Sequence, residues 1–511
     1  MNKSKEKLSG GNRLHKFSPL FILIHVIWKS IVPLAFGLYT YSKVNSANHI
    51  IIAFAVVISA FSLLQYWFYH YWLENDKIEI KEGIFFKQHR KVPYTRIQNV
   101  NVVQNPLQRI LKVSTLQLES ASGGKPEAVM RVVGLDVVEE LKRRVKTANS
   151  NSSATIDETQ YEVAEDKKLE SADYLLKVST KDVIKFGIIS QKGMVYGALI
   201  FGFLAQNQIF MMKLMTYLDL FFTIPDFTKI TFAEGVIYVS VIGLVMFVFL
   251  QLMSVLWALM KFYQFQIEKQ TDRLQANMGL LSKVSATIPL KKIQLYRISE
   301  NPLHKFFNAR TITIETAGGV NTDKSGIVMR WLAPIMKKVD VATFIRKVEP
   351  KIKIGSVDWQ SLPHRAWKRV FKKGIYLSVF ILAVLLTLDY LPFFSIRNYI
   401  WFVFPLTLPL AFFYAKNFVK KTGYYFDDDI ICFKSGVWFG KQSFVKIKKI
   451  QTIMIHESPF DRRNKMATLE IDTAGSNLLL HHVKIPYLEL HDAYQIRNFI
   501  NNKLQSEDFD W

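Results

Sequence analysis

Cysteine is nearly absent from this chain of 511 residues, which contains only Cys432. A single thiol excludes an internal disulfide framework and any metal site built from several cysteines, and it fits a reducing compartment. Catalytic signatures are missing as well: the sequence has no Walker loop, no Gly-x-Ser-x-Gly, no His-Glu-x-x-His and no Cys-x-x-Cys. These absences argue against an enzyme and predict no cofactor and no metal.

Acidic residues are in short supply too. Lys and Arg number 66 against 42 Asp and Glu, which gives a formal net charge of +24. Such an excess indicates either nucleic acid or an anionic membrane surface as the partner. Half of the residues are hydrophobic, which suits a membrane protein with sizeable soluble parts. We therefore expect an anionic phospholipid membrane as partner and no nucleic acid.

Six apolar runs are long enough for membrane helices, which need roughly 20 residues. They cover approximately residues 17–41, 50–71, 194–222, 236–262, 375–394 and 399–418. Aromatic residues are expected at the membrane interface where runs end, such as Tyr69 and Tyr71 for the second run and Phe262 for the fourth. Lys and Arg gather outside each pair of runs, whereas the loops within pairs are weakly charged. The positive-inside rule then predicts three hairpins in a bacterial cell membrane, with both termini and all soluble parts in the cytoplasm.

After each hairpin the sequence repeats itself in a fixed register. The landmarks are Ile97-Gln98, Ile293-Gln294 and Ile450-Gln451, each with an upstream glycine (Gly83, Gly279, Gly436) and a downstream Asn-Pro-Leu, Asn-Pro-Leu or Ser-Pro-Phe followed by a cation (Arg109, Lys305, Arg462). Internal repeats of this kind indicate copies of one folded unit.

Each copy combines strand and helix patterns. Period-two alternation, as in Ile78–Gly83, predicts short half-buried strands, and apolar residues at helical spacing, as in Leu135, Val138 and Leu141, predict a final helix. Short strands closed by one C-terminal helix predict a split β-barrel of pleckstrin-homology (PH) type. The fold class expected is thus a multi-domain membrane protein with six transmembrane α-helices in three hairpins and three PH-like split β-barrels, each closed by a C-terminal α-helix.

With these landmarks the chain resembles the bacterial pleckstrin-homology-domain membrane proteins of the YdbT-like group. The landmarks of the first copy are Gly83, Pro93, Ile97, Gln98, Asn105, Pro106, Leu107, Ser120, Ala121, Gly123 and Gly124. The third copy departs from this pattern, with Lys446 in place of the proline and Ser458 in place of Asn. The resemblance implies a cell-membrane protein without a known reaction and a smaller companion PH-like membrane protein as partner.

The domain boundaries follow from these patterns. We expect a basic tail at 1–16, hairpins at 17–72, 181–262 and 374–421, modules at 73–146, 263–349 and 422–505, a flexible linker at 147–180, and a basic, Trp-containing interfacial linker at 350–373.

Candidate binding residues are cations near the repeated landmarks and in the second linker. They are Lys91, Arg96, Arg109, Lys291, Lys292, Arg297, Lys305, Arg365, Lys368 and Arg369. They would face lipid headgroups or an acidic partner. The recurring Gly, Pro and Ile are better explained by turns and core packing.

Two functions remain open. The first is a non-enzymatic scaffold whose modules bind one another, a companion or anionic headgroups, in envelope stress or resistance to antimicrobial peptides, with a homo-oligomer as one form. The alternative is a transporter or lipid-handling protein whose helices surround a polar path lined by Gln206, Asp389 or Lys29. Repeats that are parallel, not inverted, favour the scaffold.

Overall fold

The structure is a computed structural model that describes residues 12–24, 47–84, 86–120, 127–152, 174–221, 232–270, 272–317, 330–350, 352, 354, 357–389, 401–473 and 483–506. The chain divides into two compact units. The described part of the first contains the chain up to Tyr174 together with Phe265–Pro289, and that of the second contains most of the remainder.

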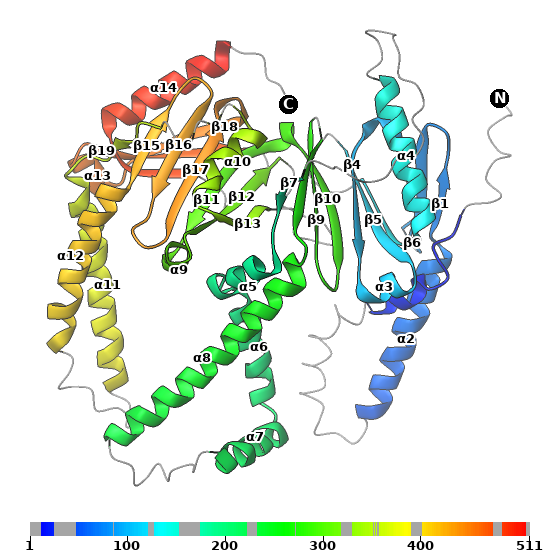
Figure 1. Cartoon of the computed structure of the whole chain (residues 1–511), viewed down its shortest axis with the longest axis horizontal. Coiled ribbons are helices and arrows are strands. Elements are labelled where there is room, and N and C mark those ends of the chain that lie inside the picture. The colour runs from blue at the N-terminus through cyan, green and yellow to red at the C-terminus, as the bar shows by residue number, and fades with distance from the viewer. Residues whose placement is uncertain are drawn as a thin grey trace. The chain divides into compact units, whose positions relative to one another are not determined.

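In the first unit helix α2 leads into the first module (Figure 1). Its elements are α2 (Ala47–Trp67), β1 (His70–Leu73), β2 (Lys77–Glu82), β3 (Gln88–Pro93), η1 (Tyr94–Arg96), β4 (Ile97–Gln104), α3 (Pro106–Ile110), β5 (Val113–Ser120), β6 (Ala128–Gly134) and α4 (Leu135–Ser152), followed by β8 (Gln266–Gln270), β9 (Arg273–Met278) and β10 (Lys283–Pro289) of the second module.

The first module is built from two antiparallel sheets, β1-β2-β3 and β4-β5-β6, that share one hydrophobic core. Ile78, Ile97 and Leu118 are fully buried in that core. Helix α4 packs on it through Val138, Leu141 and Val145, which recur at helical spacing on one face. This arrangement is the split barrel closed by a C-terminal helix that the alternation predicts.

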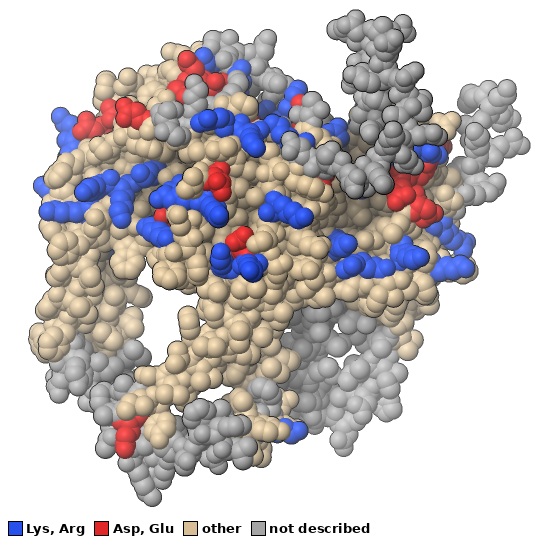
Figure 2. All heavy atoms as spheres, in the orientation of Figure 1, with Lys and Arg blue, Asp and Glu red and all other residues tan. Residues whose placement is uncertain are grey.

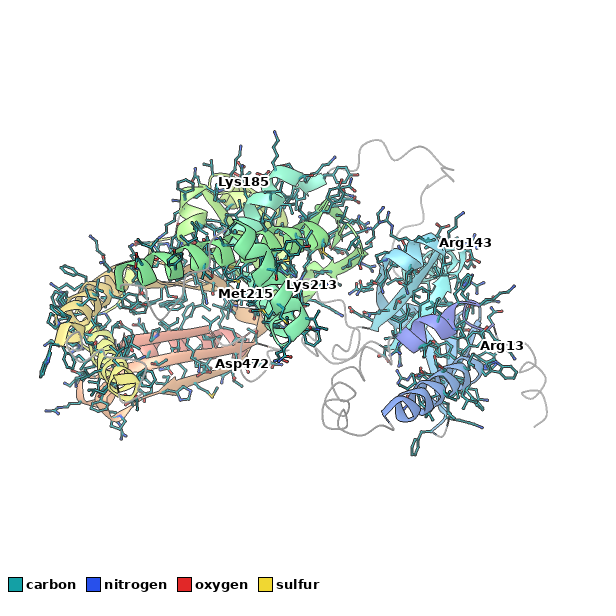
Figure 3. All side chains as sticks on the ribbon, turned by 90° about the horizontal axis from the view of Figure 1, so that it is seen from below. Arg13, Arg143, Lys185, Lys213, Met215 and Asp472 are labelled. Carbon is teal, nitrogen blue, oxygen red and sulfur yellow. The ribbon has the colours of Figure 1, made fainter. Side chains whose placement is uncertain are left out.

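The end of the second apolar run differs from the prediction. Helix α2 stops at Trp67, and Tyr69 and Tyr71 are buried in the core of the first module and not placed at a membrane interface. A short strand, β1, starts at His70 because its aromatic side chains find an apolar core there. Trp67, the last residue of α2, is covered by Arg13, whose guanidinium carbon lies 5.4 Å from the centroid of the Trp67 ring. Figure 3 labels Arg13.

The second unit starts with four helices. They are α5 (Thr180–Ile189), α6 (Lys192–Ala205), α7 (Gln208–Phe221) and α8 (Phe232–Phe262), after a short strand β7 (Tyr174–Lys177). The third apolar run, expected as one span, is broken between α6 and α7 at Gln206 and Asn207. Glycines allow α6 to approach α8 closely, since a Cβ on Gly193 would lie 2.3 Å from the Ser254 Cα.

Helix α8 ends inside an aromatic cluster below the second module. The Phe262 ring lies edge-on to Phe186 of α5 and to Trp331, with centroids 5.2 and 5.3 Å apart, and it is fully buried. Phe262 was expected at a membrane interface. It fixes α8 to the module instead, because edge-to-face aromatic contacts add to the free energy of burial.

The rest of the second unit carries the remaining strands. They are η2 (Leu290–Lys292), β11 (Ile293–Glu300), α9 (Pro302–Phe306), β12 (Ala309–Thr316), β13 (Trp331–Lys337), α10 (Asp340–Val348), β14 (Gln360–Ser361), α11 (Ala366–Asp389), α12 (Val403–Lys421), β15 (Gly423–Phe426), β16 (Ile430–Ser435), β17 (Gly440–Lys446), η5 (Ile447–Lys449), β18 (Ile450–His456), α13 (Pro459–Arg463), β19 (Met466–Thr473), β20 (Val483–Glu489) and α14 (Leu490–Ser506).

The third module repeats the architecture of the first. Its core joins the sheet containing β15-β16-β17 to the separate sheet β18-β19-β20, and α14 packs on it through Ala493, Ile496 and Ile500. Helices α11 and α12 run side by side away from this module (Figure 1). Ala366 and Val370 at the start of α11 belong to the module core, so this hairpin and the module form one packed body.

Two of the described helices are long and apolar enough to cross a membrane. The qualifying segments are Ser240–Phe262 of α8 and Ala366–Thr387 of α11, and a third exists if α5 and α6, bent by 66°, count as one span. Val56–Trp67 of α2 is a shorter apolar helix. Residues 25–46 lie outside the described residues, and with them most of the first expected span and Lys29.

Both expected linkers contain regular structure at their ends. Helix α4 continues to Ser152, inside the flexible linker predicted from 147, and α5 begins at that linker's last residue, Thr180. In the second linker, β14 pairs with β15 and α11 starts at Ala366. The part of the second linker near α11 is therefore a portion of the third module.

Candidate functional site: the junctions between modules

The modules are joined through their strand edges. In the first unit β10, from the second module, pairs antiparallel with β4 of the first module, so that β6-β5-β4-β10-β9-β8 is a continuous order within one sheet. In the second unit β17, from the third module, pairs antiparallel with β11 of the second. Backbone hydrogen bonds between strands thus connect each module to the next.

Both junctions use the same register. Val284 lies opposite Val103 at the first junction, and at the second junction the repeat-equivalent residues Lys441 and Ser299 lie opposite each other. The neighbouring pairs match as well: Lys283 with Gln104 corresponds to Gly440 with Glu300, and Ser285 with Val102 corresponds to Gln442 with Ile298. Because a slip of one residue would turn every side chain to the other face, identical registers show that the two junctions are copies of one interaction.

A cation secures each junction at the same place. The Arg109 guanidinium donates to the Leu280 carbonyl oxygen at 3.0 Å, and the Lys305 ammonium donates to the Val437 carbonyl oxygen at 3.4 Å. Arg109 and Lys305 are the cations of the repeated motif, and Leu280 and Val437 each follow the turn glycine of the next module. Two of the ten candidate cations are therefore contacts between modules.

The repeated glycines shape the turns that carry those carbonyl groups. Gly83, Gly279 and Gly436 have φ of +112°, +110° and +102°, a region that other residues rarely adopt. A Cβ on Gly279 would lie 2.0 Å from the Ser282 carbonyl oxygen, and the other two turns are equally tight. This result agrees with the structural explanation that the sequence favoured for these positions.

The Asn-Pro and Ser-Pro motifs start the short helices that hold the junction cations. Asn105, Asn301 and Ser458 are the N-cap residues of α3, α9 and α13, and each forms a reciprocal capping box with the residue three positions later. The proline occupies the first helical position, where a missing N–H costs nothing. The motif thus sets the direction of the helix that presents Arg109 or Lys305.

His304 completes the capping box of α9 and is nearly buried. Its Nδ1 accepts from the Asn301 backbone N–H at 3.2 Å, and its Nε2 lies 2.9 Å from the Thr311 hydroxyl oxygen. That hydroxyl donates to the Pro334 carbonyl oxygen, so Nε2 donates to the hydroxyl, and Nδ1 also lies 2.8 Å from the Asn301 Oδ1 atom. Burial lowers the pKa of His304 to about 4 and outweighs the opposing charge of Glu300.

The Ile-Gln landmark is a β-bulge. The pairing with the following strand skips one residue between Ile97 and Asn99, between Ile293 and Leu295, and between Ile450 and Thr452. The glutamine is the extra residue each time, and a bulge bends the strand at that point. The landmark is therefore explained by the bend of the strand, without a ligand.

Several other candidate cations are engaged within their own module. Lys91 pairs with Glu79 at 3.0 Å, and Arg297 pairs with Glu315 at 2.9 Å. Arg369 is largely buried and pairs with Asp461 at 2.7 Å while donating to the Ser458 hydroxyl. Burial opposes ionisation of Asp461, but hydrogen bonds from Ser458 and Arg369 outweigh it and lower the pKa of this carboxyl.

Other candidates remain accessible at the surface. Arg365 forms an exposed ion pair with Glu489, and the side chains of Arg96 and Lys368 are exposed without a hydrogen bond or ion pair to another described residue. Figure 2 shows Lys and Arg gathered over the strand-rich parts of the chain, whereas the visible surface of α8 and α11 carries few of them. Such a distribution suits apolar helices in lipid below basic soluble modules.

Lys291 lines a pocket between the second and third modules. The pocket has a volume of about 180 Å³, and its lining residues are Lys291, Glu349, Ile352, Asp429, Ile430, Lys446, Lys448 and Lys449. Lys446 forms an ion pair with Glu349. Lys292, next to Lys291 in η2, is partly buried and has a partner of its own. Four lysines against two acids leave this pocket with a basic surplus.

Sequence reasoning found the junction cations but missed what they contact. The carbonyl groups of Leu280 and Val437 carry no side-chain signal, and an edge pairing leaves no trace in side-chain alternation. The available signal was the recurrence of both the turn glycine and the cation in every copy, at one fixed spacing within the copy. The sequence also gave no reason to single out His304, because Gln108 and Asp461 stand at the equivalent positions.

Comparisons with known proteins agree with this architecture. The family model described as Bacterial PH domain matches residues 22–149, 219–349 and 370–504. The chain is similar to the UPF0699 transmembrane protein YdbT of Bacillus subtilis (strain 168), with 25% identity over 483 residues, which cover 92% of this chain and 94% of that protein. No solved structure matches the chain. Since the three matched segments cover well over half of the sequence, the chain belongs to the bacterial PH domain family.

Proposed function

We propose that the protein is a non-enzymatic scaffold in the bacterial cell membrane. Three hairpins, six membrane helices in all, hold three PH-like modules at the cytoplasmic face, where they bind partner proteins and anionic headgroups. The observation that carries this proposal is the pair of identical junctions, because a strand edge that joins one module to the next is also a surface suited to binding a partner.

The membrane part of the proposal rests on composition and on the relative. Segments in α8 and α11 have the length and hydropathy of spans, and the similar protein from Bacillus subtilis is named a transmembrane protein. The cytoplasmic orientation rests on the Lys and Arg that flank the apolar runs. A reporter fused after residue 150 or 350 is expected to be active only on the cytoplasmic side, and activity on the outer side would contradict the orientation.

Anionic headgroups are proposed to bind beside the second junction. Lys291, Lys448 and Lys449 line the pocket there, and the surplus of lysines over acids favours an anionic ligand. The full-length protein purified in mild detergent should retain anionic phospholipid, detected by mass spectrometry. Exchange of Lys291 and Lys448 for Glu should reduce it, whereas the control Arg346→Glu on α10 should not.

The partner is proposed to be a membrane protein with a PH-like module, such as a smaller companion. Affinity purification of the tagged full-length chain from its native membrane tests this directly. Recovery of a membrane partner supports the scaffold. If no membrane protein co-purifies and the retained lipid shows no preference for anionic headgroups, the scaffold proposal is wrong.

One observation favours the alternative of a transporter or lipid-handling protein. The third apolar run is interrupted at Gln206 and Asn207, and broken helices with polar residues at the break occur at transporter substrate sites. Asp389 and Lys29, expected to line the same path, have side chains outside the described residues. Substrate flux in proteoliposomes that is lost in Gln206→Ala would favour this alternative.

A further inference from the structure

Two strand edges are left over from the two junctions. Within the described residues β3 pairs only with β2, at the start of the module series, and β18 pairs only with β19, at its end. Unpaired edges expose backbone N–H and C=O groups that readily accept another strand. Edges of this kind at both ends of a repeating series need a structural explanation.

The two left-over edges are of complementary type. By position in the repeat, β3 is equivalent to β10 and β17, the strands that each module offers to the module before it. Likewise β18 is equivalent to β4 and β11, the strands that accept the following module. β3 and β18 are thus equivalent to the two strands that pair with each other at both internal junctions.

The side chains of β18 are more exposed than their equivalents in β4 and β11. Ile298 in β11 is 2% exposed and Val102 in β4 is 9% exposed, whereas the equivalent Ile455 in β18 is only half-buried. The adjacent Met454 is 40% exposed. No lysine or proline interrupts Ile450–His456, although such residues commonly protect an exposed edge from association.

Transfer of the observed register to these edges gives a chemically consistent pairing. Gln88 would lie opposite His456, as Val284 lies opposite Val103, and Lys87 would then face Glu457. The transferred register therefore places one pair of opposite charges, Lys87 and Glu457, at the junction, which favours this order of partners.

The cation of the junction is present at the free end as well. Arg462 in α13 occupies the repeat position of Arg109 and Lys305, and its side chain is exposed. The carbonyl that it would reach in a third junction is that of Ile84, the residue after Gly83 and thus the equivalent of Leu280 and Val437. Both components of the contact are thus present, Arg462 beside one free edge and Ile84 beside the other.

We propose that β18 of one copy pairs with β3 of a second copy of this chain, in the register of the two internal junctions. Copies in one membrane share their orientation, so a head-to-tail interface can repeat. Such a heterologous contact closes into a ring or extends as a filament. This inference rests on the proposed scaffold function and specifies its partner surface.

Disulfide trapping tests the pairing in full-length protein in native membranes. Two differently tagged copies carry Cys432→Ser; one also carries Gln88→Cys and the other His456→Cys. Residues directly opposite on paired strands are close enough for a disulfide. Oxidation should shift the protein to the mass of two copies bearing both tags. The matched control replaces His456→Cys by Thr452→Cys, about 13 Å along the strand, and should stay at the mass of one copy.

An internal pair separates failure of this inference from failure of the scaffold. In the same membranes, Ser299→Cys with Lys441→Cys reports the second internal junction. If this pair forms a disulfide and the pair between copies does not, the inference is wrong and the scaffold stands. It is wrong as well if the shifted control crosslinks equally, if β3 crosslinks to another protein, or if a chain with both cysteines forms only a disulfide within itself.

Discussion

Acidification should weaken the second module through a single histidine. His304 is held neutral in the folded chain, with its pKa lowered by burial from 6.5 to about 4. Since the unfolded chain binds a proton below pH 6.5 and the folded chain does not, the free energy of unfolding decreases as pH falls through this range. The effect fades as pH rises above 6.5 and stops growing below about pH 4.

The expected size follows from the pKa values. At pH 5.5, one unit below the unfolded value, the loss amounts to about 1.4 kcal/mol relative to neutral pH. Because α9 also carries Lys305, which contacts the third module, the loss should be felt at the second junction. A single buried histidine thereby links the strength of that junction to pH.

The chain provides the matched variant. Gln108, at the equivalent position of the first module, makes the same two contacts, accepting from the Asn105 backbone N–H and donating to the Thr115 hydroxyl. His304→Gln should therefore keep the fold and remove the pH dependence. The assay is amide hydrogen exchange of β12 at pH 5.5 and 7.5, corrected for the intrinsic effect of pH on exchange.

The outcomes are clearly separated. The unchanged chain should lose about 1.4 kcal/mol of opening free energy in β12 at pH 5.5, and His304→Gln should lose far less. Equal losses in both proteins would refute the assignment of a neutral His304 as the cause.

Two further predictions concern the turn and the ion pairs. Gly279→Ala should destabilise the first junction by about 1–3 kcal/mol in chemical denaturation, because Gly279 has a positive φ and a close carbonyl group. The control Gly202→Ala, with open space around it, should be neutral or stabilising. Equal effects of the two substitutions would argue against the strained turn. In thermal unfolding, Arg369→Ala should destabilise the third module by about 3–5 kcal/mol, because the carboxylate of its partner Asp461 stays buried. Arg365→Ala, which removes an exposed ion pair, should cost about 1 kcal/mol or less. Similar losses in the two arginine variants would contradict this difference.

Much of the fold could be predicted because side-chain periodicity reports burial. Alternation at Ile78–Glu82 predicted β2, and helical spacing at Leu135–Val145 predicted α4. The apolar run around Gln206 was wrongly taken as one helix, because hydropathy is averaged over a window and is insensitive to a break of two residues. Tyr69 and Tyr71 were assigned to a membrane interface, because the sequence pattern of aromatic residues is the same at the end of a span and at the start of a module core.

The candidate site was predicted only in part. Arg109 and Lys305 were singled out, but as residues that face lipid headgroups or an acidic partner, and their carbonyl partners were not expected. Edge pairing depends on backbone groups that every residue has, so alternation identifies the buried face of a strand and leaves its neighbour undetermined. Only the comparison of equivalent positions across the three copies reveals the repeated contact.

The central claim is that consecutive modules join through one repeated strand register. Paired cysteines in the Cys432→Ser chain test it, with Val103→Cys and Val284→Cys at the first junction and Ser299→Cys and Lys441→Cys at the second. Mass spectrometry of the oxidised full-length protein should find both disulfides and none between Ser299→Cys and the off-register Val445→Cys. Absence of either expected disulfide, or equal formation of the off-register one, would contradict the claim.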